Sequence, residues 1–102
     1  MRKADVFIQD RLAGLLKEED DGTYSFTYQE GYSGPPVSLA MPVIRRNYAF
    51  KNFPPFFDGL LPEGVQLEAL LRREKLDRDD YLGQLITVGA DLVGAVTVKK
   101  SV

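Results

Sequence analysis

The chain has 102 residues, of which 44% are hydrophobic and 27% charged, and its formal net charge at pH 7 is −2. This balance is typical of one globular domain, and it argues against a disordered tail and against a nucleic-acid-binding domain, which usually carries a basic excess. The sequence contains no cysteine and no histidine, which excludes disulfides and thiol chemistry and removes the commonest metal ligand and general base. We expect no cofactor and no metal site.

The N-terminal segment lacks the character of a signal peptide. Asp5 and Asp10 interrupt the stretch that would have to be its apolar region. No run elsewhere approaches the roughly 20 apolar residues that cross a bilayer. We therefore expect residues 1–102 to form a single domain of a cytoplasmic protein that contacts no membrane.

The first two predicted strands form a hairpin. In the stretch from Ala4 to Gln9, apolar and polar residues alternate, which is typical of a strand buried on one face. Asp10–Arg11 then turns the chain into a second apolar stretch, Leu12 to Lys17.

A third strand follows an acidic turn. The run "EEDDG", Glu18 to Gly22, ends in Asp-Gly, which favours a tight turn because glycine accepts a positive φ. The run lacks the alternating ligands and central glycine of an EF-hand calcium loop, so we interpret it as a solvated hairpin turn. The strand itself, Thr23 to Gln29, places its aromatic residues on one face: Tyr24, Phe26 and Tyr28.

The middle of the chain is predicted to be rich in loops. Glycine and proline dominate Gly31 to Pro36, and "VSLAMP", Val37 to Pro42, is predicted to be a short extended segment. No sustained period is visible from Val43 to Lys51.

Two helices and a closing strand complete the prediction. The first helix lies in "EGVQLEALLRREKL", with Leu67, Leu70 and Leu71 at helical spacing. Asp77 can cap the second helix, Asp79 and Asp80 suit its first turn, and Gly89 is placed to end it. Its buried stripe is Leu82, Leu85 and Ile86, and the closing strand is Gly94 to Lys100. These elements predict an α+β domain, with a small antiparallel sheet of four or five strands packed against two or three helices.

The most unusual stretch is "PPFFDGLLPEG", Pro54 to Gly64. It is too broken by proline and glycine to be a core helix and too apolar to be an ordinary loop. We expect Phe56, Phe57 and Leu60 to face the core. The knuckle Pro62–Val65 is a stiff turn with an apolar tip, which favours docking to another protein because little entropy is lost.

No enzymatic constellation is present in the sequence. Neither a G-x-G-x-x-G loop nor a G-K-[ST] ending occurs, and the four serines have no recognisable partner. Asp58 and Glu63 could act as a carboxylate pair, but helix-end and turn chemistry beside Gly59 and Gly64 is the reading we favour. We expect the chain not to be an enzyme.

Two basic groups are the remaining charged feature: Arg45–Arg46 and Arg72–Arg73–Lys75. They would form a patch if the fold brought them together. We favour solvated surface over contact with nucleic acid, because the net charge gives no reason to expect a polyanion partner.

Three ordered stretches give the chain a resemblance to a known family. "PPVSLAMP" (Pro35 to Pro42), "FFDGLLPEG" (Phe56 to Gly64) and "GADLVGAV" (Gly89 to Val96) are similar to motifs in the N-terminal subdomain of bacterial HipA-type serine/threonine kinase toxins. The resemblance covers nearly the whole chain. The departures from the family pattern are Ala40–Met41, Gly59 in place of asparagine and Ala90 in place of arginine.

The chain lacks the Gly-rich loop, the catalytic Asp–Asn pair and the metal-binding Asp motif of a kinase core. It therefore resembles the HipS-type antitoxin subunits of three-component HipBST toxin–antitoxin systems. The resemblance implies binding to a HipT-like kinase near its nucleotide and substrate site. It also implies a HipB-like helix-turn-helix protein in a ternary complex, which would supply the DNA binding.

The resemblance also suggests roles for single residues. Relatives often carry tryptophan where this chain has Val65, and we expect the kinase contact to comprise Pro62, Glu63, Gly64, Val65 and Gln66. The motif residues expected to serve the structure are Phe56, Phe57, Asp58, Leu60, Leu61, Gly89, Asp91 and Gly94. An alternative to the inhibitory role remains open, namely a structural subunit or detached domain that supports assembly of the kinase without inhibiting it.

Overall fold

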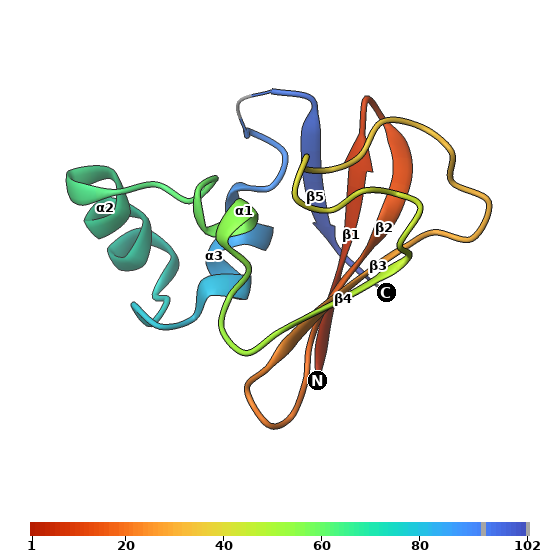
Figure 1. Cartoon of the computed structure of the whole chain (residues 1–102). Coiled ribbons are helices and arrows are strands. Elements are labelled where there is room, and N and C mark those ends of the chain that lie inside the picture. Colours follow the sequence, from red (N-terminus) through yellow and green to blue (C-terminus); the bar gives the residue numbers. More distant parts are fainter. Residues whose placement is uncertain (93, 102) are drawn as a thin grey trace.

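The computed structural model describes residues 1–92 and 94–101. Val93, which belongs to the third motif, and Val102 lie outside the described residues. The elements follow the chain in this order: β1 (Arg2–Ile8), β2 (Arg11–Glu18), β3 (Tyr24–Tyr28), β4 (Asn47–Phe50), α1 (Pro55–Asp58), α2 (Gly64–Glu74), α3 (Tyr81–Val88) and β5 (Val96–Lys100). The predicted α+β class, with an antiparallel sheet and helices, is confirmed (Figure 1).

The strands form one antiparallel sheet in the order β4-β3-β2-β1-β5. Ile8 pairs with Arg11, so the first hairpin turns through Gln9 and Asp10, both with positive φ (49° and 68°). That geometry matches the right-handed twist of the two strands. The closing strand β5 returns to pair with β1, which brings the two ends of the chain to neighbouring strands.

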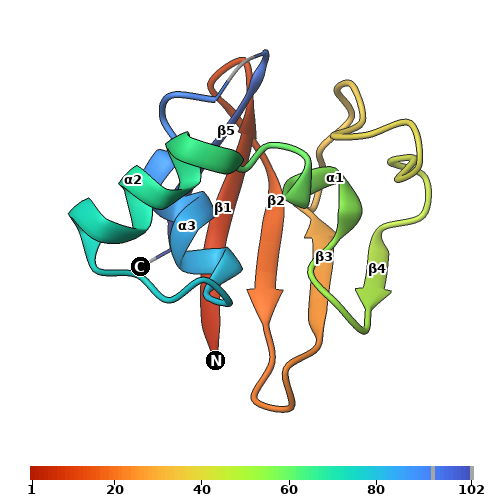
Figure 2. The same cartoon turned by 90° about the vertical axis from the view of Figure 1, so that its left-hand side faces the viewer.

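One face of the sheet carries the core. Alternate residues of the strands are buried there, and the helices cover them, with α1 lying over β2 and β3 and α3 over β1 (Figure 2). The largest fully buried side chains of this core include Phe26, Phe57, Leu16, Leu82 and Leu85. The edge-to-face contact of Tyr24 with Phe53, at 5.2 Å between ring centroids, joins the sheet to the segment that precedes α1.

Tyr28 fixes the long loop that carries the first motif. Its buried hydroxyl donates to the carbonyl of Met41 and accepts from the amide of Val37 at 3.0 Å. Its ring also stacks on Tyr32, at 5.9 Å between centroids. The loop is therefore held to β3 at both ends of the "VSLAMP" segment.

Gly89 joins α3 to the edge strand β5. The Val98 amide donates to the Gly89 carbonyl at 3.0 Å, and a Cβ at position 89 would lie far inside contact distance of the Val98 carbonyl. Only glycine permits this close approach. Gly94, in the same motif, has a φ of +102°. Both glycines of the third motif therefore have a role in the backbone, Gly89 through a close approach and Gly94 through its positive φ.

Arg2 ties the start of the sheet to the start of α3. It forms a bidentate pair with Glu18 at 2.8 and 3.1 Å and reaches Asp80 at 2.6 Å. Hydrogen bonds from Arg2 hold the pKa values of both carboxyl groups below their ordinary range. The Tyr24 hydroxyl donates to Glu18 at 3.1 Å, and burial, with that bond, raises the pKa of Tyr24 to about 12.

Three predictions of local structure were wrong. Val43 to Lys51 contains an edge strand, β4, whose side chains are only half-buried at Tyr48 and Phe50, so its alternation is short and weak. Val37 to Pro42 is a turn rather than an extended segment, because Met41 donates to the Ser38 carbonyl at 2.9 Å. The cap of α3 is Asp80 rather than Asp77, since its side chain accepts from the Gly83 amide.

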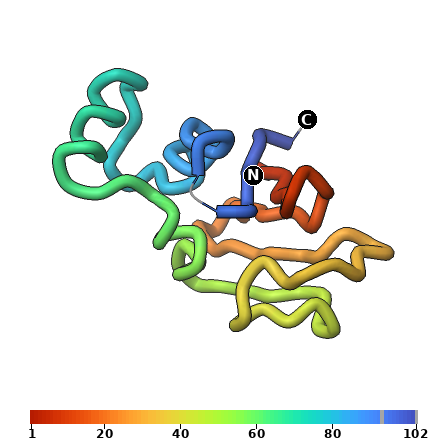
Figure 3. The backbone as a smooth tube through the Cα atoms, turned by 90° about the horizontal axis from the view of Figure 1, so that it is seen from above, coloured from red at the N-terminus to blue at the C-terminus, as the bar shows by residue number. Residues whose placement is uncertain are grey.

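Helix α2 lies farthest from the sheet, with α3 between them (Figure 3). Leu70 is its buried residue, Leu67 and Leu71 are half-buried, and Leu70 belongs to no part of the main core cluster. An ion pair between Glu68 and Arg78 on the surface links α2 to the turn before α3. Within the described residues, none of the helices is long and apolar enough to cross a bilayer.

Candidate partner-binding surface

The knuckle Pro62–Val65 has a constrained backbone. Glu63 is extended, with φ −130° and ψ 163°, and Gly64 has a φ of +58° as the first residue of α2. No neighbouring atom would obstruct a side chain at position 64, so glycine is required there for its φ alone. The sharp entry into α2 therefore depends on Gly64.

Val65 projects from this turn into solvent. Its side chain is 86% exposed, and Glu63, Gly64 and Gln66 beside it are exposed as well. The half-buried Pro62 joins them to the body of the protein. The five residues expected to contact a kinase thus lie together at one end of α2, with the apolar tip that the sequence predicted.

Behind the knuckle, the second motif is anchored in the core. Phe57 is completely buried and its ring lies 5.9 Å from that of Phe26. Leu60 and Leu61 donate to the carbonyls of Phe57 and Asp58 at 3.0 and 3.1 Å, which continues α1 as a tight turn. Phe56, Leu60 and Leu61 pack on the core but remain half-buried. The prediction of core positions holds fully for Phe57 and in part for Phe56 and Leu60.

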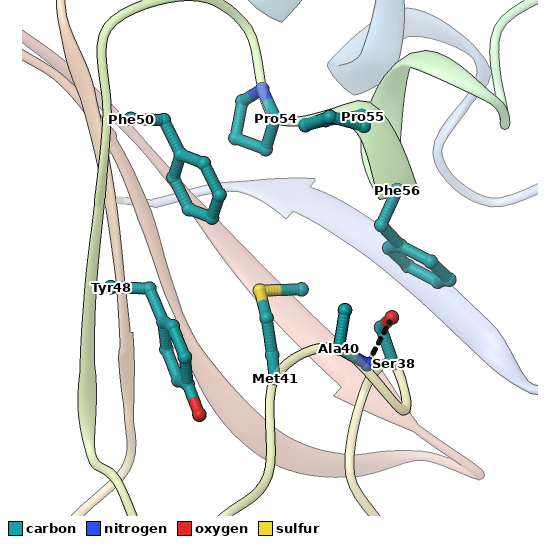
Figure 4. A pocket seen from close by; sticks show the side chains of 8 residues that line it. All are labelled: Ser38, Ala40, Met41, Tyr48, Phe50, Pro54, Pro55 and Phe56. Atoms are coloured by element: carbon teal, nitrogen blue, oxygen red, sulfur yellow. Dashed lines mark hydrogen bonds between the residues drawn. The ribbon is translucent and has the colours of Figure 1, made fainter.

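Parts of two motifs line an apolar hollow beside α1. It has a volume of about 420 Å³ and is lined by Ser38, Ala40, Met41, Tyr48, Phe50, Pro54, Pro55 and Phe56. Figure 4 shows the rings of Tyr48, Phe50 and Phe56 around the Met41 side chain. Leu39 and Ile44, in the same loop, are 93% and 94% exposed. We refer to this site as the loop hollow.

The second and third motifs meet at another hollow, between α2 and the end of α3. Its lining comes from the second motif and the knuckle, from α2, from the end of α3 and from the third motif: Leu60, Leu61, Pro62, Gln66, Arg73, Thr87, Val88, Asp91 and Leu92. The three motifs are separated in the sequence, but in the fold all of them line hollows next to α1 or the turn that follows it. The expected partner contact shares Pro62 and Gln66 with this hollow.

Asp58 and Glu63 lie on the wall of one hollow with Arg78 and Asp79. Both side chains are exposed. Glu63 occupies the cap position of α2 without making a side-chain cap bond, and Asp58 ends α1. In the described part of the chain, no three acidic side chains are grouped as metal ligands.

The two basic groups do not meet. Arg45 and Arg46 precede the edge strand β4, whereas Arg72 and Arg73 lie on α2, beyond α3 (Figures 1 and 2). Arg46 donates to the carbonyls of Gln29 and Tyr32 and so holds the loop. The patch that the sequence left open is absent from the described residues.

Sequence reasoning missed the loop hollow. Its residues come from a loop, a strand that was not predicted and α1, and they meet only in the fold. The signal available was the alternation of Tyr48 and Phe50, which marks an apolar strand face.

Comparisons with known proteins agree with the motifs. The family described as the HipA N-terminal domain matches residues 4–99. An uncharacterized protein of Haemophilus influenzae (strain Rd) is 29% identical over 100 residues, which are 98% of this chain and 93% of that protein. A solved structure described as the N-terminal domain of HipA toxin is 25% identical, with a TM-score of 0.79, and the match covers 100% of this chain and 94% of that one. The chain belongs to the HipA N-terminal domain family.

Proposed function

We propose that this chain is an antitoxin that binds and inhibits a HipA-family serine/threonine kinase toxin, as a HipS-type subunit does. The observation that carries this proposal is Val65, an apolar side chain that is 86% exposed at the tip of a constrained turn. Such a side chain contributes little to the fold. Because the turn is already ordered, little conformational entropy is lost when it docks.

In this proposal the residues Pro62–Gln66 enter the kinase near its nucleotide and substrate site. Phosphoryl transfer depends almost entirely on the positions of the nucleotide, the metal ions and the acceptor hydroxyl. A plug therefore inhibits by occupying space and needs no chemistry of its own. Full burial of a valine side chain contributes about 1.5–3 kcal/mol, so Pro62 and Gln66 are expected to share the contact.

The comparisons support the setting of this proposal. The Haemophilus relative is aligned over 93% of its length, so a protein of similarly small size carries this domain. The net charge of −2 agrees with a division of labour in which a HipB-like helix-turn-helix protein binds DNA. The complex would then contain this chain, a HipT-like kinase and that DNA-binding protein.

The loop hollow favours a second candidate function, in which the chain supports the assembly of the kinase without inhibiting it. The hollow is apolar, and the neighbouring Leu39 and Ile44 are more than 90% exposed. A kinase that packs on this surface would be bound by residues of the loop, β4 and the start of α1 rather than by Val65. The two functions therefore depend on different side chains.

The test is to purify the chain with the kinase encoded beside its gene and to measure complex formation, autophosphorylation and growth arrest. Val65→Asp is expected to abolish inhibition, whereas Ile44→Asp, an equally exposed matched control, is expected to retain it. Val65→Trp is expected to inhibit at lower concentration, because the larger ring buries more area. The proposal fails if the native chain forms no complex and leaves the toxicity unchanged. A complex that forms without lowering autophosphorylation, and that Ile44→Asp weakens while Val65→Asp does not, would instead support the assembly role of the loop hollow.

A further inference from the structure

The outer face of α2 carries more than Val65. Val65, Ala69 and Arg72 are spaced i, i+4 and i+7, which places them on one side of the helix, and all three are exposed. The leucines that α2 buries or half-buries lie on the other side: Leu67, Leu70 and Leu71. The face with Val65 at one end and Arg72 near the other is therefore not used by the fold.

The charges of α2 are unequally paired. Glu68 pairs with Arg78 and Glu74 with Arg73, at 3.0 Å for the latter. Among the described residues, no carboxylate lies within ion-pair distance of Arg72. A cation in the last turn also interacts with the helix dipole. That interaction does not depend on which face of the helix the cation occupies, so it does not explain why Arg72 lies in line with an exposed valine.

We propose that Val65, Ala69 and Arg72 form one recognition stripe, in which Arg72 pairs with a carboxylate on the kinase that receives Val65. This proposal rests on the inhibitory contact proposed above. Seven residues of helix at 1.5 Å per residue separate the two ends by about 10 Å. The partner must therefore present an apolar recess and an acidic group at about that spacing. Ala69 between them is small enough to let the partner's surface approach the helix.

The chemistry of the partner fits this requirement. Kinase clefts contain carboxylates that hold magnesium ions and orient the acceptor hydroxyl. A cation at the edge of such a cleft would attract those charges, whereas a second acidic residue would be repelled. The charge on Arg72 therefore complements an acidic site beside the nucleotide-binding region.

The two ends of the stripe affect different rate constants. A solvent-exposed ion pair at the rim of an interface changes mainly the association rate and its salt dependence. A buried apolar side chain changes mainly the dissociation rate. Removing Arg72 and removing Val65 should therefore give kinetically distinct defects.

The experiment measures the binding kinetics of the full chain to its kinase subunit at low and high salt. Arg72→Glu is expected to slow association about fivefold at low salt, with a smaller difference at high salt and a nearly unchanged dissociation rate. Val65→Ala, which removes apolar area without adding a charge, is expected to accelerate dissociation instead. Lys51→Glu is the matched control, because it reverses an exposed cation in the turn after β4. Circular dichroism of each variant verifies that it is folded.

The outcomes separate the two proposals. If Arg72→Glu associates as fast as Lys51→Glu while Val65→Ala still dissociates faster, the stripe is wrong and the inhibitory contact stands. A defect of Arg72→Glu that is equally large at high salt would also overturn the ion pair. Absence of binding by the native chain would overturn both.

Discussion

The sheet with its packed helix α3 and the outlying helix α2 use apolar side chains in opposite ways. Phe26, Phe57 and Leu82 have no exposed surface in the main core. On α2, Leu70 is 2% exposed, whereas Val65 at the tip is 86% exposed. We infer that the core between the sheet and its covering helices provides most of the stability of the domain. Helix α2 instead exposes an apolar side chain, Val65, that the fold does not need.

The two regions also differ in how they are attached. Helix α3 is held at its start by Arg2 on Asp80 and at its end by the bond between Gly89 and Val98. Helix α2 is joined to the turn before α3 by the surface ion pair of Glu68 and Arg78. Surface ion pairs contribute little, typically below about 1 kcal/mol. We therefore expect α2 to open more readily than α3.

Phe57→Ala is expected to have the largest effect on stability. Removing a fully buried aromatic ring costs about 3–5 kcal/mol in the free energy of unfolding, because a cavity remains. Val65→Ala is the contrasting variant on α2 and should change that free energy by less than about 0.5 kcal/mol. Urea denaturation followed by circular dichroism measures both. Equal losses in the two variants would contradict the division into a stabilising region and a presenting region.

Leu70→Ala should destabilise α2 alone. Loss of this buried side chain is expected to lower the opening free energy of the α2 amides by about 2 kcal/mol. Native-state hydrogen exchange measures this, and the amides of β1 and β2 are expected to retain their protection. Gln66→Ala, an exposed position on the same helix, serves as the control. A uniform loss of protection across the sheet would mean that α2 belongs to the same cooperative unit.

Asp80→Ala should have a smaller effect, spread over the link between β1 and α3. It removes a helix cap and one partner of Arg2, and caps contribute about 1 kcal/mol. Asp79→Ala, the exposed neighbour, should leave the unfolding free energy within about 0.5 kcal/mol of the native value. Thermal unfolding of both variants checks the difference.

The same link predicts how stability depends on pH. The folded-state pKa values of Asp80 and Glu18 lie below their ordinary values of 3.8 and 4.5. Their contribution is therefore fully present above about pH 5, and it is lost as the pH falls below those values through the folded-state pKa values. The acid-induced loss should be smaller in Asp80→Ala than in the native chain. An equal loss in both would exclude Asp80 as a contributor.

Local patterns in the sequence predicted several elements of the fold correctly. The aromatic alternation of Tyr24, Phe26 and Tyr28 predicted β3, and Gly89 ended α3 as expected. The turn before Val65 was also predicted, because proline and glycine restrict the backbone locally. The binding of a kinase by residues Pro62–Gln66 stays a prediction, which the binding experiment tests.

The cap of α3 shows where local reasoning failed. Asp77, Asp79 and Asp80 are all suitable cap residues by type. Asp80 is selected in the fold, where its side chain meets both the Gly83 amide and Arg2 of β1. Arg2 is 78 positions away in the sequence, so no local pattern could have singled out Asp80. The strand β4 was missed for a related reason, because its alternation is limited to Tyr48 and Phe50 and its pairing with β3 is visible only in the fold.

The sequence by itself determined the class of the domain, most of its elements and the stiff apolar turn, because periodicity and backbone preference act over a few residues. Only the tertiary structure decided which apolar groups are buried. It placed Phe57 inside the core and Val65 outside it, and it left Ala69 and Arg72 exposed on the outer face of α2. The physical reason is that burial depends on what packs from distant parts of the chain, whereas a side chain's hydrophobicity is the same in either place.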